Sequence, residues 1–358
     1  MGIRNKLTQP STQHGVATSI LRPDQDFILN IAPTRENPDL ISWIKENRTY
    51  LLESLLQHGA LRFTGFKLTP EQFALATELA LPEDQSLLNY TAGVSRRTKV
   101  KDELFLSTTL SNKAFLIQHN EMSYMPSWPS KIVFYCDIEP PVGGETPVCS
   151  NRQFTKKLDP KILKRFTEKK VQYIRNYRSD SQMGVSWEQS FETDNKKEVE
   201  AHCKKFGFEF KWLPGNHLRT SNLSQGSVTH PKTGEVVWFN HAYMLNNGSD
   251  NPNVAPPGLR AFMPAMTDEV IKEMKATPPT ELPHNSFYGD GSLIESSIIE
   301  ELHSIYESES VAFKWQKGDF IILDNVLASH GRNPFEGDRR ILTILKEPKA
   351  HSTLKIVK

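Results

Sequence analysis

The sequence has no long apolar run, no excess of charge of either sign and few cysteines. A membrane-spanning helix needs about 20 consecutive apolar residues, and no such run occurs among the 358 residues. Lys and Arg number 43 against 42 Asp and Glu, a balance that does not predict a nucleic-acid or polyanion partner. We therefore expect neither a nucleic acid nor a membrane as partner.

The three cysteines, Cys136, Cys149 and Cys203, show neither the spacing of a metal site nor a disulfide framework. The polar beginning of the chain, MGIRNKLTQPSTQHG, contains no apolar segment of the kind found in secretory signals. These two absences predict a cytoplasmic protein with reduced thiols.

The expected domain organisation is an extended N-terminal arm over residues 1–38, followed by a single domain over 39–358. Residues 40–58 carry apolar side chains at helical spacing and are followed by Gly59, which is typical of a helix C-terminus. Thr69-Pro70-Glu71-Gln72 predicts another helix start, with Thr69 as N-cap and Gln72 at the capping-box position. A helical insert is expected at about 151–210.

The middle and the end of the chain are rich in predicted strands. SKIVFYCDIE has the apolar run and the β-branched content of a buried strand, and SVTHPKTGEVVWFN predicts a β-hairpin. VAFKWQKGDFIILDN and RRILTILKE predict strands on both sides of His330, whereas residues 246–292 predict long loops. The expected fold class is mainly β with α insertions, built on a double-stranded β-helix (jelly-roll) core.

The most informative residues are His119 and Glu121, in FLIQHNEMSY, and the distant His330. On a strand, positions two apart share one face, so both members of the His-x-Glu pair can reach one ion. Two imidazoles and one carboxylate that leave coordination positions open are typical of non-haem Fe(II) oxygenases. Alone, a His-x-Glu pair is more often a polar strand on the surface.

The surroundings of His330 favour the metal interpretation. His330 follows the apolar strand FIILDN, and a Gly- and Pro-containing turn then leads to Arg339 and Arg340. We expect Arg340 to lie across the barrel from His330 and to hold the carboxylate of an organic co-substrate. Strand alternation would then turn Arg339 outward.

Residues from about 60 to 347 resemble the TauD/TfdA (taurine dioxygenase-like) superfamily of Fe(II)/2-oxoglutarate-dependent oxygenases. Clavaminate synthase-like and syringomycin-biosynthesis-type members are the most similar, through HNEM, FYCDIEPPVGGETPV, VWFNHAY, GDFIILDN and HGRNPFEGDRRI. The resemblance implies Fe(II) at His119, Glu121 and His330, and O2 as the oxidant. It also implies that 2-oxoglutarate is bound as co-substrate by Arg340 and Thr146.

The sequence departs from the family pattern at two positions. Many relatives carry Asp where Glu121 stands, and Glu at this position is common among the amino-acid hydroxylases of the superfamily. The arginine that binds sulfonate in taurine dioxygenases, four residues beyond the co-substrate arginine, is replaced by Ile344. A sulfonate substrate is therefore disfavoured.

Several residues are candidates for substrate contact, each with an ordinary structural alternative. The alternatives are a solvated basic surface for the arginines, packing for the tyrosine, and a satisfied structural role for the last two residues. The candidates are Arg96, Arg97, Tyr124, Asn240 and His241.

These features predict hydroxylation of an unactivated C–H bond in a small amino-acid-like molecule, free or tethered to a carrier protein, in specialised metabolism. Desaturation or epoxidation on the same scaffold is one alternative. A non-catalytic cupin-like binding protein is another, although a binding module does not need the whole set of candidate ligands. The sequence leaves both a monomer and a homo-oligomer open.

Overall fold

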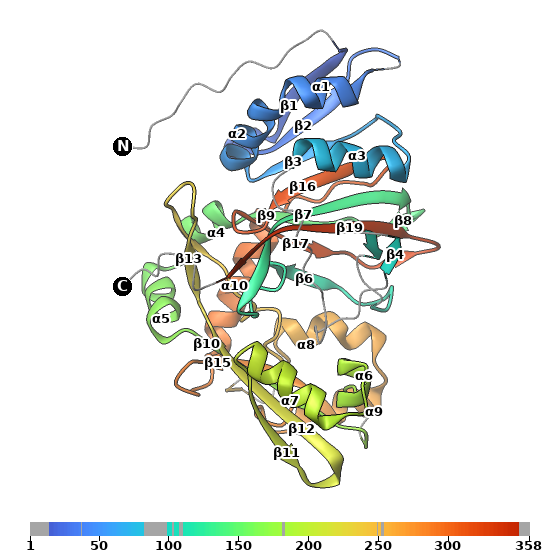
Figure 1. The fold of residues 1–358 in the computed structure, drawn as a ribbon. Helices are drawn as coiled ribbons and strands as arrows, with labels where there is room; N and C mark the ends of the chain where they lie inside the picture. Colours follow the sequence, from blue (N-terminus) through green and yellow to red (C-terminus); the bar gives the residue numbers. More distant parts are fainter. Residues whose placement is uncertain are drawn as a thin grey trace.

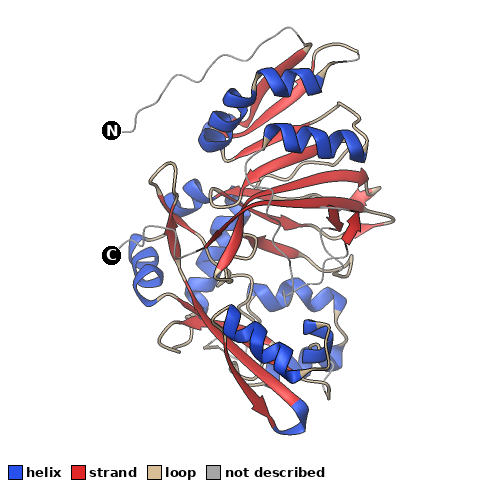
Figure 2. Ribbon diagram, in the orientation of Figure 1, coloured by secondary structure: helices blue, strands red, loops and turns tan. Residues whose placement is uncertain are grey.

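The computed structural model describes residues 14–36, 38–81, 110–180, 183–248, 250–251 and 254–350, and the backbone of 99–101 and 104–106. In Figure 1, helices α1–α3 lie over a large sheet in the upper part of the molecule, and a smaller sheet with its own helices forms the lower part. Figure 2 shows that strands run through both parts. None of the described helices is long and apolar enough to cross a bilayer.

The largest sheet contains eight strands in the order β1-β2-β3-β16-β7-β19-β5-β4. Only β2 and β3 run parallel; the other neighbours are antiparallel. The strand bounds are Val16–Arg22 (β1), Phe27–Pro33 (β2), Ala60–Phe63 (β3), Phe320–Asp324 (β16), Ser127–Ile138 (β7), Arg340–Ala350 (β19), Leu104–Leu106 (β5) and Lys99–Lys101 (β4).

The first two strands differ from the extended arm expected over residues 1–38. β1 and β2 form an antiparallel hairpin, and β2 joins the main sheet through Leu29 and Ile31, which pair with β3 and are buried. Hydrogen bonding to a neighbouring strand and burial of alternate side chains, rather than contact with the surface alone, hold this segment in place. The division into arm, domain and insert stays a prediction.

Helices α1 (Leu40–Glu46), α2 (Arg48–His58) and α3 (Pro70–Ala80) pack on one face of the main sheet. The expected helix over residues 40–58 is thus two helices, and Gly59 ends the second with a φ of 72°. The expected capping box of Thr69 and Gln72 is present at the start of α3. These local signals were readable because they involve only neighbouring residues.

Strand β7 is buried on both of its faces. Val133 and Tyr135 point toward the helices, whereas Ile132, Phe134 and Cys136 point to the opposite side, where they pack against residues of a second layer. This explains the unbroken apolar run in the sequence, since a strand covered on both sides needs no polar face.

The second layer is a short sheet in the order β6-β17-β9, with the pair β18-β8 beside it. Val148 of β9 and Ala328 of β17 belong to the same apolar cluster as the inner face of β7, so this cluster fills the space between the layers. The arrangement confirms the expected mainly-β jelly-roll core. The bounds are Leu116–His119 (β6), Ala328–Arg332 (β17), Val148–Ser150 (β9), Phe335–Glu336 (β18) and Val142–Gly143 (β8).

The lower part contains a four-stranded sheet, β11-β12-β10-β15, and the expected hairpin β13-β14. Its strands are Val171–Tyr177 (β10), Glu209–Leu213 (β11), His217–Ser224 (β12), Ser227–Thr229 (β13), Val236–Trp238 (β14) and His284–Tyr288 (β15). The helices that follow β9 are Asn151–Lys157 (α4), Pro160–Lys169 (α5), Trp187–Phe191 (α6), Lys196–Lys205 (α7), Pro257–Phe262 (α8), Asp268–Ala276 (α9) and Ser296–Glu309 (α10).

The expectation of long loops over residues 246–292 is wrong. This region contains α8, α9 and β15. Thr267 caps α9 by accepting a hydrogen bond from the Val270 N–H, and Asp268 and Glu269 occupy its first turn. The Pro and Asn residues nearby obscured this helix signal.

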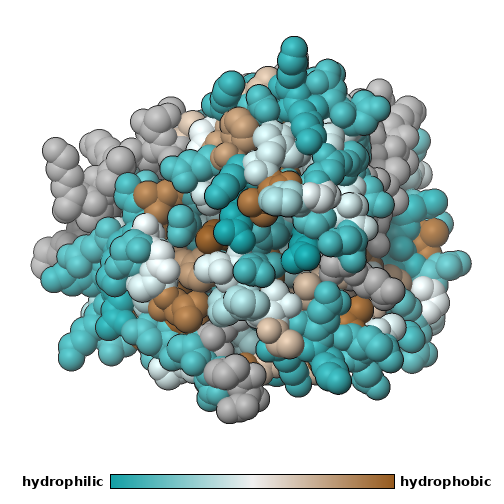
Figure 3. All heavy atoms as spheres, turned by 90° about the horizontal axis from the view of Figure 1, so that it is seen from below, coloured by the Kyte–Doolittle hydropathy of each residue, from teal (hydrophilic) through white to brown (hydrophobic). Residues whose placement is uncertain are grey.

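Hydrophilic residues predominate on the face seen in Figure 3, and apolar residues occur there in small separate groups. Few large apolar side chains among the described residues are exposed: Leu75, Phe115, Val142, Val185, Leu223, Val236 and Val254. The apolar surface that stabilises the fold is therefore mostly inside the clusters between the layers.

A buried ionic cluster holds the turn between β16 and β17. Lys131 Nζ lies 2.8 Å from Asp324 Oδ2, and His230 Nε2 lies 3.2 Å from the same oxygen. Burial alone would raise the pKa of Asp324, but Lys131 and His230 outweigh it and hold that pKa well below its usual range. The other carboxylate oxygen accepts from the N–H groups of Val326 and Leu327. The cluster is thus closed: each charge has a partner.

We expect Lys131→Met to lower the free energy of unfolding by about 3–5 kcal/mol, because it leaves the Asp324 carboxylate buried without its cation. Chemical denaturation measures the change. The matched control is Lys164→Met, which removes an exposed pair with Glu168 and should cost less than about 1 kcal/mol. Equal losses in the two variants would contradict this account of the cluster.

Candidate metal centre

His119 and His330 lie opposite one another on neighbouring antiparallel strands. β6 ends at His119, β17 carries His330 at its centre, and the two residues are paired across the ladder. The centroids of their rings are 4.3 Å apart. The pairing of β6 with β17 therefore brings together two histidines that are far apart in the sequence.

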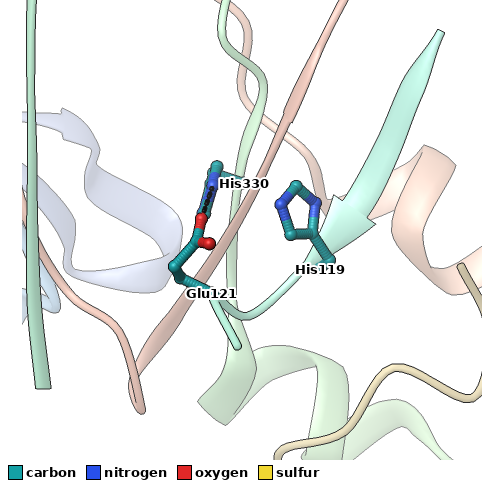
Figure 4. Close-up of side chains that lie close together, drawn as sticks. All are labelled: His119, Glu121 and His330. Atoms are coloured by element: carbon teal, nitrogen blue, oxygen red, sulfur yellow. Dashed lines mark ion pairs between the residues drawn. The ribbon is translucent and has the colours of Figure 1, made fainter. Parts of the chain in front are cut away.

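Glu121 completes the group from the turn that follows β6. One ligand atom from each of His119, Glu121 and His330 lies within 4.8 Å of the other two, and all three residues are buried. Glu121 Oε2 is 3.8 Å from His330 Nε2, and Figure 4 shows the side chains converging. The sequence predicted that strand alternation would put Glu121 on the same face as His119. This is wrong, because β6 ends at His119, and contacts other than strand pairing must position Glu121.

The donor set fits a divalent metal ion. His119 Nδ1 lies 3.0 Å from the carbonyl oxygen of Ile117, which can only accept a hydrogen bond. Nδ1 therefore carries the proton, and the lone pair of Nε2 is available to a metal. Two imidazoles and one carboxylate from the ends of adjacent strands form the donor set of 2-His-1-carboxylate iron sites.

Aromatic rings enclose the three residues. The Phe134 ring lies 4.9 Å from His330, and His241 lies 5.4 Å from His119. Tyr124 packs 4.9 Å from His241. Burial holds the pKa of His241 well below its usual range, so this imidazole is neutral. The structure thus places two of the expected substrate residues, Tyr124 and His241, beside the centre.

A third expected substrate residue, Asn240, makes contacts within its own loop. Asn240 uses its Nδ2 on the carbonyl of Gly226 and its Oδ1 on the N–H of Ala242. Both ends of the amide thus help to shape the loop, and contact of Asn240 with the substrate stays a prediction. Arg96 and Arg97 lie outside the described residues.

Arg340 does not face the metal centre. Its side chain is 49% exposed and forms an ion pair with Asp137 on the outer side of β7. The register of β19 against β7 shifts between Arg340 and Ile341, which pair with Ile138 and Cys136 respectively. Ile341 packs between the layers and Leu342 on the helix side, so regular alternation along β19 turns Arg340 to the helix side and Arg339 inward. The expected position of Arg340 across from His330 is therefore wrong.

Arg339 takes the inward position instead. Its Nε donates to the carbonyl of Gly144 at 2.9 Å, and its terminal nitrogens make no hydrogen bond to the described residues. Gly144 has a φ of 70°, and a Cβ there would come within 2.9 Å of Arg339 Cδ. Burial, and then the charge of Arg332, lowers the pKa of Arg339 to about 10, so it remains a cation at neutral pH.

Arg332 is a second cation on the same side, and it is buried, whereas Arg339 is half-buried. It donates to the carbonyls of Leu110, Ser111 and Ala114, and burial lowers its pKa to about 10. The guanidinium carbons of Arg332 and Arg339 lie 5.3 and 5.5 Å, respectively, from the centroid of the Phe335 ring. Within the described part of the chain, neither forms an ion pair with a carboxylate. A buried and a half-buried cation, near the charge of Glu145 but without an ion pair to it, favour the binding of an acidic ligand.

Thr146 lies opposite Arg332 in the adjoining segment. Gly331 N–H donates to the carbonyl of Pro147 and Asn333 N–H to that of Glu145, which sets this register. The Thr146 hydroxyl accepts a hydrogen bond from Trp315 Nε1 at 3.0 Å. The expected pairing of Thr146 with a co-substrate arginine stays a prediction.

A sequence model of the family described as taurine catabolism dioxygenase TauD, TfdA family matches residues 29–345. The chain belongs to the TauD/TfdA family. It is 30% identical over 297 residues to the dapdiamide synthesis protein DdaC of Enterobacter agglomerans, covering 83% of this chain and 84% of that one. It is 27% identical over 322 residues to a clavaminate synthase-like protein of Arabidopsis thaliana, covering 87% and 89%.

Solved structures agree on the fold. PvcB from Pseudomonas aeruginosa matches with a TM-score of 0.53 and 14% identity, covering 97% of this chain and 96% of that one. A second PvcB structure is described as an Fe, alpha-ketoglutarate dependent oxygenase from an isonitrile synthetic pathway, and matches with a TM-score of 0.52. As a member of this dioxygenase family, the protein is an oxygenase that uses Fe(II), 2-oxoglutarate and O2, and the family disfavours the alternative of a non-catalytic binding protein.

We expect His330→Ala to weaken the binding of a divalent ion by more than about 100-fold. Loss of a residue that only supports a metal ligand typically costs about 10–100-fold in affinity, and loss of a ligand itself should cost more. Anaerobic calorimetric titration with Co(II) measures this. His202→Ala, on the distant helix α7, is the control and should bind as the unaltered protein does. A His330→Ala protein with unchanged affinity would remove His330 from the ligand set.

Proposed function

We propose that the protein hydroxylates an unactivated C–H bond of a small amino-acid-like substrate, free or tethered to a carrier protein, in specialised metabolism. The observation that carries this proposal is the convergence of His119, Glu121 and His330 in a TauD/TfdA chain. The similarity to DdaC, a protein named for the synthesis of dapdiamide, supports a biosynthetic role. The glutamate in the His-x-Glu pair favours an amino-acid-like substrate within the family.

His119, Glu121 and His330 are the proposed ligands of iron. His119 would bind through Nε2, because its Nδ1 proton is held by the carbonyl of Ile117. When bound, the iron supplies the redox chemistry that couples the decarboxylation of 2-oxoglutarate by O2, to succinate and CO2, with oxidation of the substrate. The protein's own task is to hold the reactants and to exclude water.

Arg339 is the proposed partner of the distal carboxylate of 2-oxoglutarate. Its guanidinium retains two terminal nitrogens in a fixed planar fork, which suits a carboxylate. Thr146 would add a hydroxyl to the same carboxylate, and the charge of the nearby Arg332 would strengthen the field for a dianion. A dicarboxylate entering here would give these two cations a carboxylate at ion-pair distance, which the described residues do not provide.

The substrate would lie on the side of His241 and Tyr124. His241 holds the Ser123 hydroxyl at 2.6 Å through Nδ1, so its Nε2 is the nitrogen left to meet a polar group. Contact with the substrate by Arg97 or Arg96 stays a prediction. On β19, the positions four beyond Arg339 and Arg340 are Thr343 and Ile344, both buried and uncharged, which disfavours a sulfonate substrate.

Desaturation or epoxidation remains the alternative outcome on the same scaffold, since both begin with the same activation of O2. The mass of the product separates them from hydroxylation and from each other. A hydroxylated product gains one oxygen atom, an alkene loses two hydrogens, and an epoxide formed from an alkene substrate gains oxygen with loss of the double bond.

The test is substrate-dependent release of succinate, with Fe(II), 2-oxoglutarate and ascorbate, across a panel of amino acids and their carrier-protein thioesters. We expect at least one member to raise succinate release above the uncoupled background and to yield an oxidised product by mass spectrometry. A panel without any stimulation, in protein that binds iron and 2-oxoglutarate, would reject the amino-acid-like substrate class.

We expect Arg339→Met to weaken binding of 2-oxoglutarate by about 30- to 1,000-fold, since loss of one partner of a buried charge pair costs about 2–4 kcal/mol. The measurement is quenching of tryptophan fluorescence by 2-oxoglutarate in the Co(II)-loaded protein.

Arg340→Met is the matched control on the next residue. Because Arg340 pairs with Asp137 at the outer surface, this variant should change the affinity less than about threefold. The opposite ranking of the two variants would restore Arg340 as the co-substrate arginine and reject Arg339.

A further inference from the structure

The position of Glu121 relative to the two histidines requires an explanation that strand pairing does not provide. The ladder between β6 and β17 ends at the pair His119–His330, and the chain then turns. Met122, directly after Glu121, has a φ of 56°, a conformation that costs free energy for a side chain of this kind. Other contacts must therefore hold Glu121 in its place.

The carboxamide of Asn325 supplies those contacts. Its Oδ1 accepts from the Glu121 N–H at 2.8 Å, and its Nδ2 donates to the Glu121 carbonyl at 2.9 Å. The second proton of Nδ2 goes to the carbonyl of Pro129 at 2.8 Å. The side chain thus binds both backbone groups of the carboxylate ligand, as a neighbouring strand would, and fixes the Cα from which the carboxylate projects.

Asn120 makes the return connection. Its Nδ2 donates to the carbonyls of Asn325 and Ala328, at 2.6 and 3.1 Å. Ala328 begins β17, which carries His330. Both asparagines are completely buried, so water does not compete for these hydrogen bonds. The segment of Glu121 and the segment leading to His330 are therefore tied together by side chains from both.

We propose that Asn325 is a positioning residue of the metal centre, which aligns Glu121 with His119 and His330 by pairing with the Glu121 backbone. This inference rests on the proposed role of Glu121 as a ligand. The residue type follows from the geometry: only a carboxamide of this length offers one acceptor and two donors to an N–H and two carbonyls. Aspartate would set a buried charge against two carbonyl oxygens, and leucine would leave three backbone groups without partners.

The test compares Asn325→Ala with Asn151→Ala in anaerobic titrations of the full chain with Co(II). Asn151 is also completely buried and donates to the same turn, at the carbonyl of Val326, but no hydrogen bond joins it to Glu121 in the described structure. We expect both variants to lower Tm. Only Asn325→Ala should weaken Co(II) binding, by about 10–100-fold, and reduce the change in Tm on adding Co(II).

Non-additivity separates positioning from general destabilisation. If Asn325 acts through Glu121, the double variant Glu121→Ala, Asn325→Ala should bind Co(II) no more weakly than Glu121→Ala alone. Asn325→Ser, which retains one hydrogen-bonding group, should lie between the unaltered protein and Asn325→Ala. This milder variant also serves where Asn325→Ala does not fold.

The outcomes are distinguishable. An unchanged affinity in Asn325→Ala or Asn325→Ser, an equal loss in Asn151→Ala, or additive losses in the double variant would each overturn the positioning role. If Glu121→Ala itself retains the affinity, the proposed ligand set fails instead.

Discussion

The antiparallel pairing of β6 with β17 is the constraint on which the site depends. It sets His119 opposite His330 at the end of one ladder and between two packed sheets. The same strand β17 pairs on its other side with β9, so the segment that contains Gly144 and Thr146 runs beside residues 331–334, directly after His330. A single strand therefore borders both the proposed iron ligands and the proposed co-substrate cations, and a shift of its register would displace both.

Charged side chains are paired with opposite charges in one part of the protein and not in another. Around Asp324, cations and anions lie within hydrogen-bonding distance of each other and hold a turn. Around Arg332 and Arg339, the described residues provide carbonyl oxygens but no carboxylate within ion-pair distance. Keeping the Arg332 cation out of water without an ion-pair partner costs free energy, and such a cost is common where a ligand supplies the missing charge. The first cluster supports the fold, and the second is suited to binding.

Much of the fold was predictable from neighbouring residues. The cap at Thr69, the glycine at 59 and the buried run of β7 each depend on a few adjacent side chains. The orientation of the arginine pair was not predictable, because β19 carries apolar residues on both of its faces and its sequence does not show which face turns inward. The hairpin of β1 and β2 was also missed, because β2 is held by pairing with β3, and two helices separate these strands in the chain. The pairing of Asn325 with Glu121 likewise has no local signal.

The sequence by itself determined the chemistry: two histidines and a carboxylate as donors, arginines near the second histidine, and apolar strands able to enclose them. These properties belong to side-chain types and their order, which folding does not change. Only the tertiary structure decided that Arg339 rather than Arg340 faces inward, that Asn240 is occupied by its own loop, and that Glu121 is held by a side chain from another segment. Each of these depends on register and on contacts between distant segments, which are fixed when the sheets pack.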